Sequence, residues 1–174
     1  MLQVNYSNSS TCLNLTIFPK TILFLSSFTE NDHKSFYRFF EKSKLKKNLG
    51  TSLDINIFKK NHTVDKNLDI ISKSLIYHNL KDIIIKYFEV GEEIFLKKPQ
   101  ELTEEEGVII STSTLLLNQT NIWILRLKDK TLSDFTKTKI EKILLSKVAT
   151  SHSIIFYSTE SGKMLDIEEQ VILN

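Results

Sequence analysis

Short apolar runs that alternate with helical patterns constrain the fold of this chain more than any other feature. Residues 21–26, Thr-Ile-Leu-Phe-Leu-Ser, form a continuous apolar run of the kind found in strands buried on both faces. Thr29 and Asp32 follow with the spacing of a helix N-terminal cap. Behind that cap we expect Phe36 and one of Phe39 or Phe40 to be buried, because a helical apolar stripe about 100° wide cannot hold both neighbours.

The same alternation continues along the chain and predicts an α/β fold. We predict a single α/β domain over residues 19–160, built on a mostly buried, mixed sheet of four to five strands that is flanked by helices. Residues 1–18 begin rich in Ser and Asn and are predicted to be a loose leader. Residues 161–174 are predicted to be an amphipathic tail. Further strands are predicted at residues 53–58, 83–88, 93–97, 122–127 and 153–157, and further helices over residues 63–79, 103–117 and 133–148.

Composition excludes several classes of protein. The chain has 174 residues, of which 41% are apolar and 25% are charged, so disorder throughout is excluded. Its single cysteine, Cys12, permits no intramolecular disulfide and no zinc site built on cysteines. The apolar runs are too short to span a membrane, and no secretory signal precedes them. We therefore expect a globular protein without a membrane partner.

No catalytic motif is recognisable in the sequence. The four glycines, at positions 50, 91, 107 and 162, never occur in the spacing of a phosphate-binding loop. The histidines lack partners at metal-ligand spacing, and the hydroxyls beside His152 cannot face its ring, because adjacent residues point apart. The three carboxylates at positions 104–106 are expected to be the solvated first turn of a helix. We therefore predict that the protein is not an enzyme and has no metal, cofactor or small-molecule substrate.

Lysines outnumber arginines by 21 to 2, and several cluster near the ends of predicted elements. One group follows the first helix and another follows the strand at residues 53–58, so both would lie at one sheet edge in a βαβ unit. Such an edge would attract phosphates although the formal net charge is only +2. The alternative is that these lysines are ordinary solvated side chains. The candidate nucleic-acid-binding residues are Lys42, Lys44, Lys46, Lys47, Lys59 and Lys60.

Amino-acid usage is skewed in a way that no folding requirement explains. The chain has 21 Ile and 12 Asn but a single Ala, although Ala is the best helix former. Lys, Ile and Asn take AT-rich codons. The skew therefore predicts an organelle genome, or the genome of an AT-rich parasite, symbiont or virus.

The order of the predicted elements resembles that of the large-subunit ribosomal stalk-base protein, the tenth protein of the bacterial large subunit. Residues 21–28 and 29–47 resemble its first strand and helix. Residues 56–61 resemble its Val-Lys-Asn-Thr-like strand end, with Lys60 and Asn61 in the Lys-Asn positions. The chain departs from the family pattern in lacking the Pro after Gly91, the Gly-rich segment and the long C-terminal helix. Later segments follow in a similar order at residues 91–96, 103–118, 122–132 and 134–145.

The resemblance implies a divergent mitochondrial version of this family. It implies a structural component of the large ribosomal subunit that binds rRNA at the stalk base, with neighbouring ribosomal proteins and stalk proteins as partners. The lysines would contact phosphates and read A-form RNA by shape, and Asn61 would join them as an RNA-binding residue. The alternative is a non-enzymatic protein-interaction subunit, either an assembly factor or a viral host-interaction factor, without nucleic acid. The expected location is the mitochondrial matrix, or else the cytoplasm of an AT-rich organism.

Overall fold

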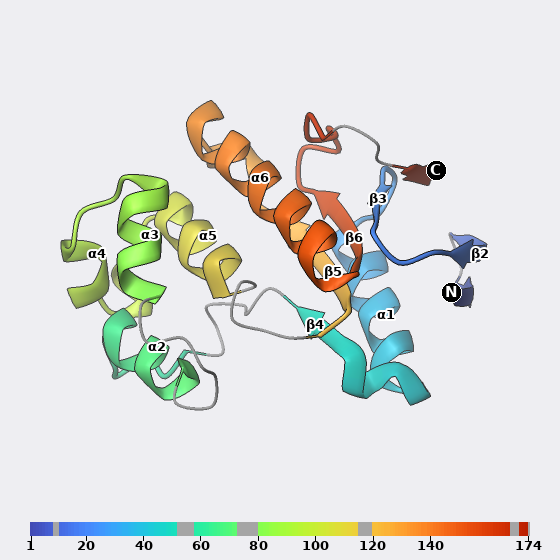
Figure 1. The fold of residues 1–174 in the computed structure, drawn as a ribbon, viewed down its shortest axis with the longest axis horizontal. Coiled ribbons are helices and arrows are strands. Elements are labelled where there is room, and N and C mark those ends of the chain that lie inside the picture. Colours follow the sequence, from blue (N-terminus) through green and yellow to red (C-terminus); the bar gives the residue numbers. More distant parts are fainter. Residues whose placement is uncertain (9–10, 52–57, 73–79, 115–119, 168–170, 174) are drawn as a thin grey trace. The chain divides into compact units, whose positions relative to one another are not determined.

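The computed structural model describes residues 1–8, 11–51, 58–72, 80–114, 120–167 and 171–173 (Figure 1). The chain divides into two compact units, each of which is described by itself. We call the first the sheet unit, and it consists of Met1–Thr51, Gln119–Lys130 and Leu144–Asn174. We call the second the helical unit, and it consists of Ser52–Asn118 and Thr131–Ile143.

The sheet unit contains a five-stranded sheet in the order β4–β5–β6–β3–β7. All four described strand pairs are parallel, and Leu23 of β3 lies opposite Phe156 of β6. The inner strands are buried along almost their whole length, as is usual for a parallel sheet. The strands are β3 (Thr21–Leu25), β4 (Leu49–Thr51), β5 (Ile122–Leu127), β6 (Ile154–Thr159) and β7 (Val171–Leu173).

The predicted α/β class, with a buried sheet of four to five strands flanked by helices, is confirmed. The strands expected at residues 122–127 and 153–157 are β5 and β6. The tail at residues 161–174 includes the short strand β7, which pairs with β3. The sequence predicted a mixed sheet. Within the described residues, antiparallel pairing occurs only between β1 and β2, which form a separate two-stranded hairpin.

That hairpin replaces the loose leader expected at residues 1–18. Strand β1 (Leu2–Ser7) pairs antiparallel with β2 (Cys12–Ile17), with Leu2 opposite Ile17 and Ser7 opposite Cys12. Every second side chain of β1 is buried, namely those of Leu2, Val4 and Tyr6. The leader was predicted from the Ser and Asn residues of this segment. The alternating apolar residues are buried instead, and their burial orders the segment as a hairpin.

Helix α1 (Glu30–Glu41) begins as the sequence predicts. Thr29 is its N-cap, and Thr29 with Asp32 forms a complete capping box. Phe36 and Phe40 are fully buried whereas Phe39 is half-buried, which confirms the expected helix phase. The 3-10 helix η1 (Lys44–Asn48) then leads into β4.

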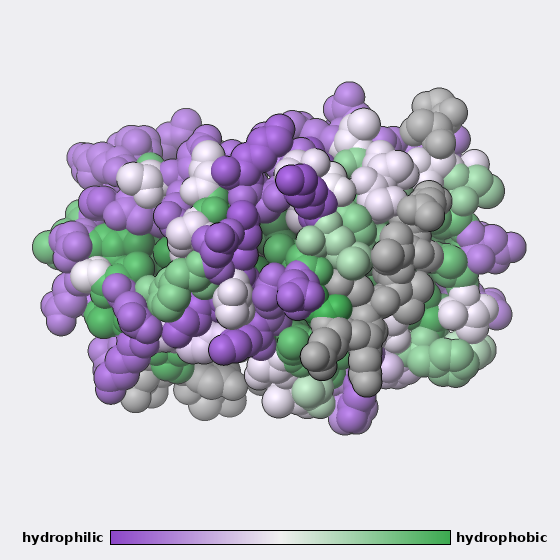
Figure 2. Space-filling view, turned by 90° about the horizontal axis from the view of Figure 1, so that it is seen from above, coloured by the Kyte–Doolittle hydropathy of each residue, from purple (hydrophilic) through white to green (hydrophobic). Residues whose placement is uncertain are grey.

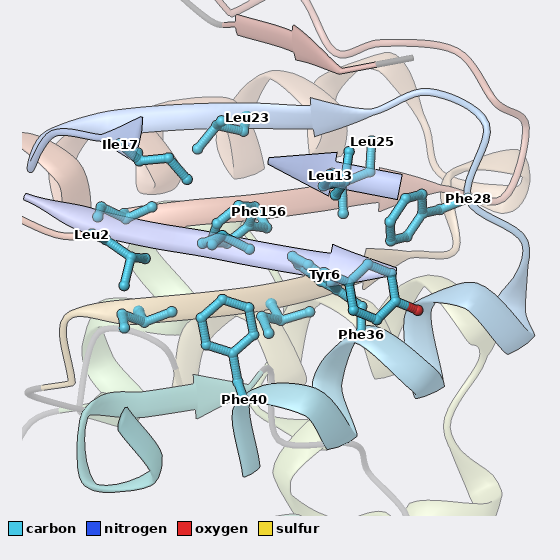
Figure 3. Close-up of a cluster of buried hydrophobic side chains, with 14 residues drawn as sticks. Leu2, Tyr6, Leu13, Ile17, Leu23, Leu25, Phe28, Phe36, Phe40 and Phe156 are labelled. Carbon is cyan, nitrogen blue, oxygen red and sulfur yellow. The ribbon is translucent and has the colours of Figure 1, made fainter. Parts of the chain in front are cut away.

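An aromatic and aliphatic cluster joins the hairpin, α1 and the sheet (Figure 3). Phe36 is at its centre, with ring centroids 4.9 Å from Tyr6, 5.5 Å from Phe28, and 5.1 Å from both Phe40 and Phe156. The mutual angles are near edge-to-face, the favoured aromatic arrangement. The cluster therefore fixes the middle and the end of α1 against the strands on which the helix packs.

The helical unit is built from short helices and the first part of α6 (Asp134–Ser151), up to Ile143. On the face shown in Figure 2, hydrophilic residues cover much of the surface of this unit. No helix in the described ranges is both long enough and apolar enough to cross a membrane. The remaining helices are α2 (Val64–Ser72), α3 (Leu80–Phe88), α4 (Glu93–Leu96), η3 (Pro99–Glu101), α5 (Glu104–Ser113) and η5 (Asp129–Thr131), the last mostly in the sheet unit.

The strands predicted at residues 83–88 and 93–97 are wrong, because both segments are helical. In α3 the buried residues Leu80, Ile84 and Phe88 recur every four positions, and Ile83 is partly exposed. Burial of this face outweighs the strand preference of the Ile run. The strand predicted at residues 53–58 and the ends of the helices predicted over 63–79 and 103–117 lie largely outside the described residues.

Helix α5 confirms the predicted capping box at Thr103 and Glu106. Glu106 also accepts from Lys97 Nζ over 2.6 Å, and this contact ties α5 to the segment after α4. At the start of α6, the N–H and Oγ of Ser133 donate to Glu105 Oε1 over 3.1 and 2.7 Å. Two helix starts are thus held by side chains from the first turn of α5.

Candidate functional site at the start of helix α1

The sheet unit has one edge where a ligand site is expected. Because its described pairs are parallel, the carboxyl ends of its strands lie at the same edge. The chain leaves β3 for β4 at one side of the sheet, whereas β7 lies on the other side of β3. Ligands of open α/β sheets bind at such a change of direction, just beyond the carboxyl ends of the strands. Here that place is the junction between β3 and α1.

The junction is short and carries its own negative charge. Ser26, Ser27, Phe28 and Thr29 connect the last residue of β3 to the first residue of α1. The N–H and Oγ1 of Thr29 donate to Asp32 Oδ2 over 3.0 and 2.6 Å, and the N–H of Asp32 donates to Thr29 Oγ1 over 3.2 Å. The Asp32 side chain therefore uses donors at the helix N-terminus that would otherwise attract an anion.

The hairpin holds this carboxylate from the other side. Asn8 Nδ2 donates to Asp32 Oδ1 over 3.0 Å and to the Tyr6 hydroxyl over 2.8 Å. Asn8 Oδ1 accepts from the N–H of Thr11 over 2.7 Å, which closes the turn between β1 and β2. Asp32 is only 8% exposed. We call Asn8, Thr29 and Asp32 the junction clamp.

Strand β5 supports the same junction. Arg126 Nη1 donates to the carbonyl oxygen of Phe28 over 3.2 Å. Burial, together with the charge of Arg126, lowers the pKa of His33 to about 4, although a hydrogen bond with the backbone of Leu125 acts in the opposite direction. His33 is therefore neutral near pH 7 and adds no cation to the helix start.

A second carboxylate lies just beyond β5. Asp129 accepts from the N–H of Ser161 over 2.9 Å at one oxygen and from the Ser161 hydroxyl at the other. Burial by itself would raise the pKa of Asp129, but the hydrogen bonds from Ser161 and from backbone N–H groups outweigh it, so the pKa lies below its usual value. Asp129 thus joins the segments that follow β5 and β6.

The predicted RNA-binding residues fall in both units of the chain. Lys42 is the C-cap of α1, and the neighbouring lysines lie on η1, in the sheet unit. Lys59, Lys60 and Asn61 are exposed and belong to the helical unit, where they lie in a turn before α2. Asn67 holds that turn by accepting from the N–H of Lys59 over 2.8 Å. A nucleic-acid role for these residues stays a prediction.

The comparisons with known proteins give the fold. No family model matches the sequence, and no curated protein matches it. An ABC transporter ATP-binding protein from Pyrococcus furiosus is similar in structure, with a TM-score of 0.72, 16% identity, and coverage of 99% of this chain and 94% of that one. The chain has the fold of an ATP-binding cassette.

Two further solved structures are similar in fold to this chain. An ATP-binding cassette solved as a dimer in a post-hydrolysis state with ADP and Pi has a TM-score of 0.62 at 11% identity, over 91% of this chain and 85% of that one. The protein cbiO1 from Clostridium perfringens, described as part of an ABC transporter complex, has a TM-score of 0.58 at 14% identity, over 90% and 76%.

These structural similarities overturn the ribosomal hypothesis. The resemblance to the ribosomal stalk-base protein, and with it the structural, rRNA-binding function and the ribosomal partners, is wrong, because the whole described chain follows a cassette fold. The alternative of a non-enzymatic interaction factor, the prediction that the protein is not an enzyme, and the exclusion of membrane partners and small-molecule substrates fail for the same reason. A shared order of strands and helices misled the comparison because different α/β folds share such orders.

The cassette fold implies ATP with Mg²⁺, and the β3–α1 junction would have to supply the chemistry of a phosphate-binding loop for it. Such a loop has the pattern G-x-x-x-x-G-K-S/T between a strand and a helix, with backbone N–H groups around the phosphates, a Lys that reaches them and a hydroxyl on Mg²⁺. Lys34 and Ser35 stand at the Lys-Ser/Thr positions of this pattern, but Phe28 and His33 stand at its two glycine positions, and Lys34 is exposed and paired with Glu30. The Asp32 carboxylate lies at the helix start. The residues present do not fit a nucleoside triphosphate bound in this manner.

The site beyond β5 does not fit the metal of such a nucleotide either. An Asp near the end of a neighbouring strand holds Mg²⁺ in proteins with phosphate-binding loops. Both oxygens of Asp129 accept from Ser161, and Lys128 precedes it in the chain. In the part of the chain that the structure describes, no cluster of three His, Cys, Asp or Glu residues is arranged to bind a metal ion.

Sequence reasoning missed Asn8, Asp129 and Ser161. Asn8 stands between two segments with alternating apolar residues, which is a hairpin signal. Asp129 follows a predicted strand by two positions, as polar residues at the carboxyl edge of a sheet do. No sequence signal pairs Asp129 with Ser161, which is 32 residues away.

Proposed function

We propose that this protein is a cassette subunit of an ATP-driven ABC transporter complex. The observation that supports this most strongly is the structural similarity to an ABC transporter ATP-binding protein over 99% of this chain and 94% of that protein. Similarity of this extent accounts for both units of the chain and not for the sheet alone. A cobalt transport ATP-binding protein is also similar, with a TM-score of 0.63 over 90% of this chain.

The partners proposed for this chain follow from the same proteins. One similar structure is described as part of an ABC transporter complex, and two are described as dimers. We therefore assign this chain a membrane-embedded subunit, which provides the path for the solute, and a second cassette. The ATPase activity is assigned to the assembled complex. The location, either the mitochondrial matrix or the cytoplasm of an AT-rich organism, remains a prediction.

The test is to identify what the full chain assembles with. The tagged chain would be purified from detergent-solubilised membranes of its source cells, and the co-purifying chains would be identified by mass spectrometry. We expect a membrane-embedded subunit in fixed ratio to this chain, together with ATP hydrolysis by the purified complex.

A high-salt wash provides the control, because salt releases proteins that are held on RNA by phosphate contacts. The transporter complex should survive this wash. Recovery of the chain with a large ribosomal subunit, or recovery without any membrane-embedded subunit, would contradict the proposal.

A further inference from the structure

We propose that the β3–α1 junction of this chain is a closed structural joint that excludes nucleotide phosphates, and that Asp32 closes it. This inference rests on the cassette fold and on the contacts at the junction. It does not rest on the proposed transport role, so it holds or fails independently of the complex that the chain joins.

The charge at the start of α1 opposes phosphate binding. The N-terminus of a helix attracts a phosphate because its N–H groups are unpaired and its dipole is positive there. In α1 the first turn carries the carboxylates of Glu30 and Asp32. Asp32 lies within 3.0 Å of the N–H of Thr29, so an incoming phosphate would meet a fixed negative charge at short range.

The backbone of the junction also leaves no room for a phosphate. A loop that wraps a phosphate needs room for the close approach of its backbone, and glycines provide that room. Here four residues without glycine cross from β3 to α1, and the carbonyl of Phe28 is held by Arg126. The ring of Phe28 is buried in the aromatic cluster, 5.5 Å from that of Phe36. The junction therefore cannot open without disturbing the core of the sheet unit.

The turn of the β1–β2 hairpin also binds the Asp32 carboxylate. Asn8 Nδ2 donates to Asp32 Oδ1 and to the Tyr6 hydroxyl, and Asn8 Oδ1 accepts from the N–H of Thr11. Within the described residues, the Asp32 carboxylate is thus bound on both sides, by α1 and by the β1–β2 turn. Rotation of this side chain to admit a phosphate would break the hydrogen bonds at both of its oxygens. In a complex that hydrolyses ATP, the phosphates would then be bound by the second cassette.

Nucleotide binding tests the joint directly. Isothermal titration of the full chain with Mg-ATP, and separately with inorganic phosphate, would be compared for wild type, Asp32→Asn and the matched control Asp134→Asn. Asp134 is an exposed carboxylate in the first turn of α6. We expect no saturable binding to the wild type or to Asp134→Asn. Binding gained only in Asp32→Asn would show that this carboxylate closes the site.

Three other outcomes decide the proposal. Saturable one-to-one binding to the wild type that changes tenfold or more in Asp32→Asn, and not in Asp134→Asn, would overturn the proposal, because the phosphates would then lie at the junction. Binding that is the same in all three proteins would place the nucleotide elsewhere and leave the junction closed. Absence of binding in all three, Asp32→Asn included, would overturn the assignment of the closure to Asp32.

A charge swap tests the clamp without any ligand. Asn8→Asp places two carboxylates together, so we expect its Tm to fall by at least about 4 °C. The double variant Asn8→Asp/Asp32→Asn restores one carboxylate and one amide, so its Tm should recover most of that loss. A double variant no more stable than Asn8→Asp would overturn the clamp. If Asn8→Asp fails to fold, the recovery of folding in the double variant gives the same answer.

Discussion

Asn8 Nδ2 lies 3.0 Å from Asp32 Oδ1 and donates a hydrogen bond to it, which joins the turn of the N-terminal hairpin to the first turn of α1. The two residues are 24 positions apart in the chain. Their contact turns the start of α1, which in a cassette fold lies where a ligand site is expected, into an internal joint of the protein.

Asn8→Ala tests the structural importance of this contact. The substitution removes the donor to Asp32 and the acceptor for the N–H of Thr11. We expect the free energy of unfolding to fall by about 1–3 kcal/mol, the cost of leaving partly buried polar groups without partners. Urea denaturation followed by circular dichroism measures it. Asn5→Ala, at an exposed position of β1, is the matched control, and an equal loss in both variants would contradict the role given to Asn8.

Phe36→Ala tests the aromatic cluster. Phe36 is fully buried and contacts rings from β1, α1, β6 and the junction loop. The variant should lose about 3–5 kcal/mol of stability, because truncation of a buried Phe leaves a cavity. Phe18→Ala, which removes a side chain that is 64% exposed, should change stability by less than about 0.5 kcal/mol. A loss of less than 1 kcal/mol in Phe36→Ala would mean that α1 packs in another phase.

The pKa of His33 predicts a dependence of stability on pH. Burial and Arg126 lower this pKa to about 4, below the value of about 6.5 for an unfolded histidine. Between these values the unfolded state binds a proton that the folded state does not. The free energy of unfolding should therefore decline as the pH falls from 6.5 to 4, by up to about 3 kcal/mol from this residue.

The measurement compares wild type with His33→Gln by chemical denaturation at several pH values between 7 and 4. The variant has no group to titrate at this position, so its decline over the same range should be smaller. Identical slopes for the two proteins would show that His33 does not make this contribution.

Ser161→Ala tests the contact between the ends of β5 and β6. The variant removes the hydroxyl donor to Asp129 and should cost about 1–3 kcal/mol near neutral pH, because Asp129 is buried and charged there. The lowered pKa of Asp129 means that this stabilisation is present above the unfolded pKa and is lost as the pH falls through the folded pKa. The difference between variant and wild type should therefore shrink below about pH 3.8.

Thermal unfolding from pH 7 to pH 3 gives both results for Ser161→Ala. Ser146→Ala, at an exposed position of α6, is the control and should follow the wild type throughout. A difference between Ser161→Ala and wild type that stays constant across the pH range would contradict the role of the charged carboxylate.

Local patterns in the sequence were sufficient for many of the elements. The apolar run of β3 and the capping boxes at Thr29 and Thr103 predicted strands and helix starts that the structure confirms, because these signals act within a few residues. The same local reasoning misassigned α3. Its Leu80, Ile84 and Phe88 had the four-residue spacing of a helix, but the run of three Ile residues at 83–85, which includes Ile84, favoured a strand.

By itself, the sequence determined the α/β class, the phase of α1 and the absence of the glycine spacing that a phosphate-binding loop requires. Only the tertiary structure decided the parallel strand order, the pairing of Asp129 with Ser161 and the clamp of Asn8 on Asp32. These contacts join residues that are 24 and 32 positions apart, and no local propensity specifies them. Burial of the hairpin and the aromatic cluster brings Asn8 to Asp32, whereas the parallel pairing of β5 with β6, with Leu127 opposite Thr159, brings Asp129 to Ser161. Buried polar groups then need partners.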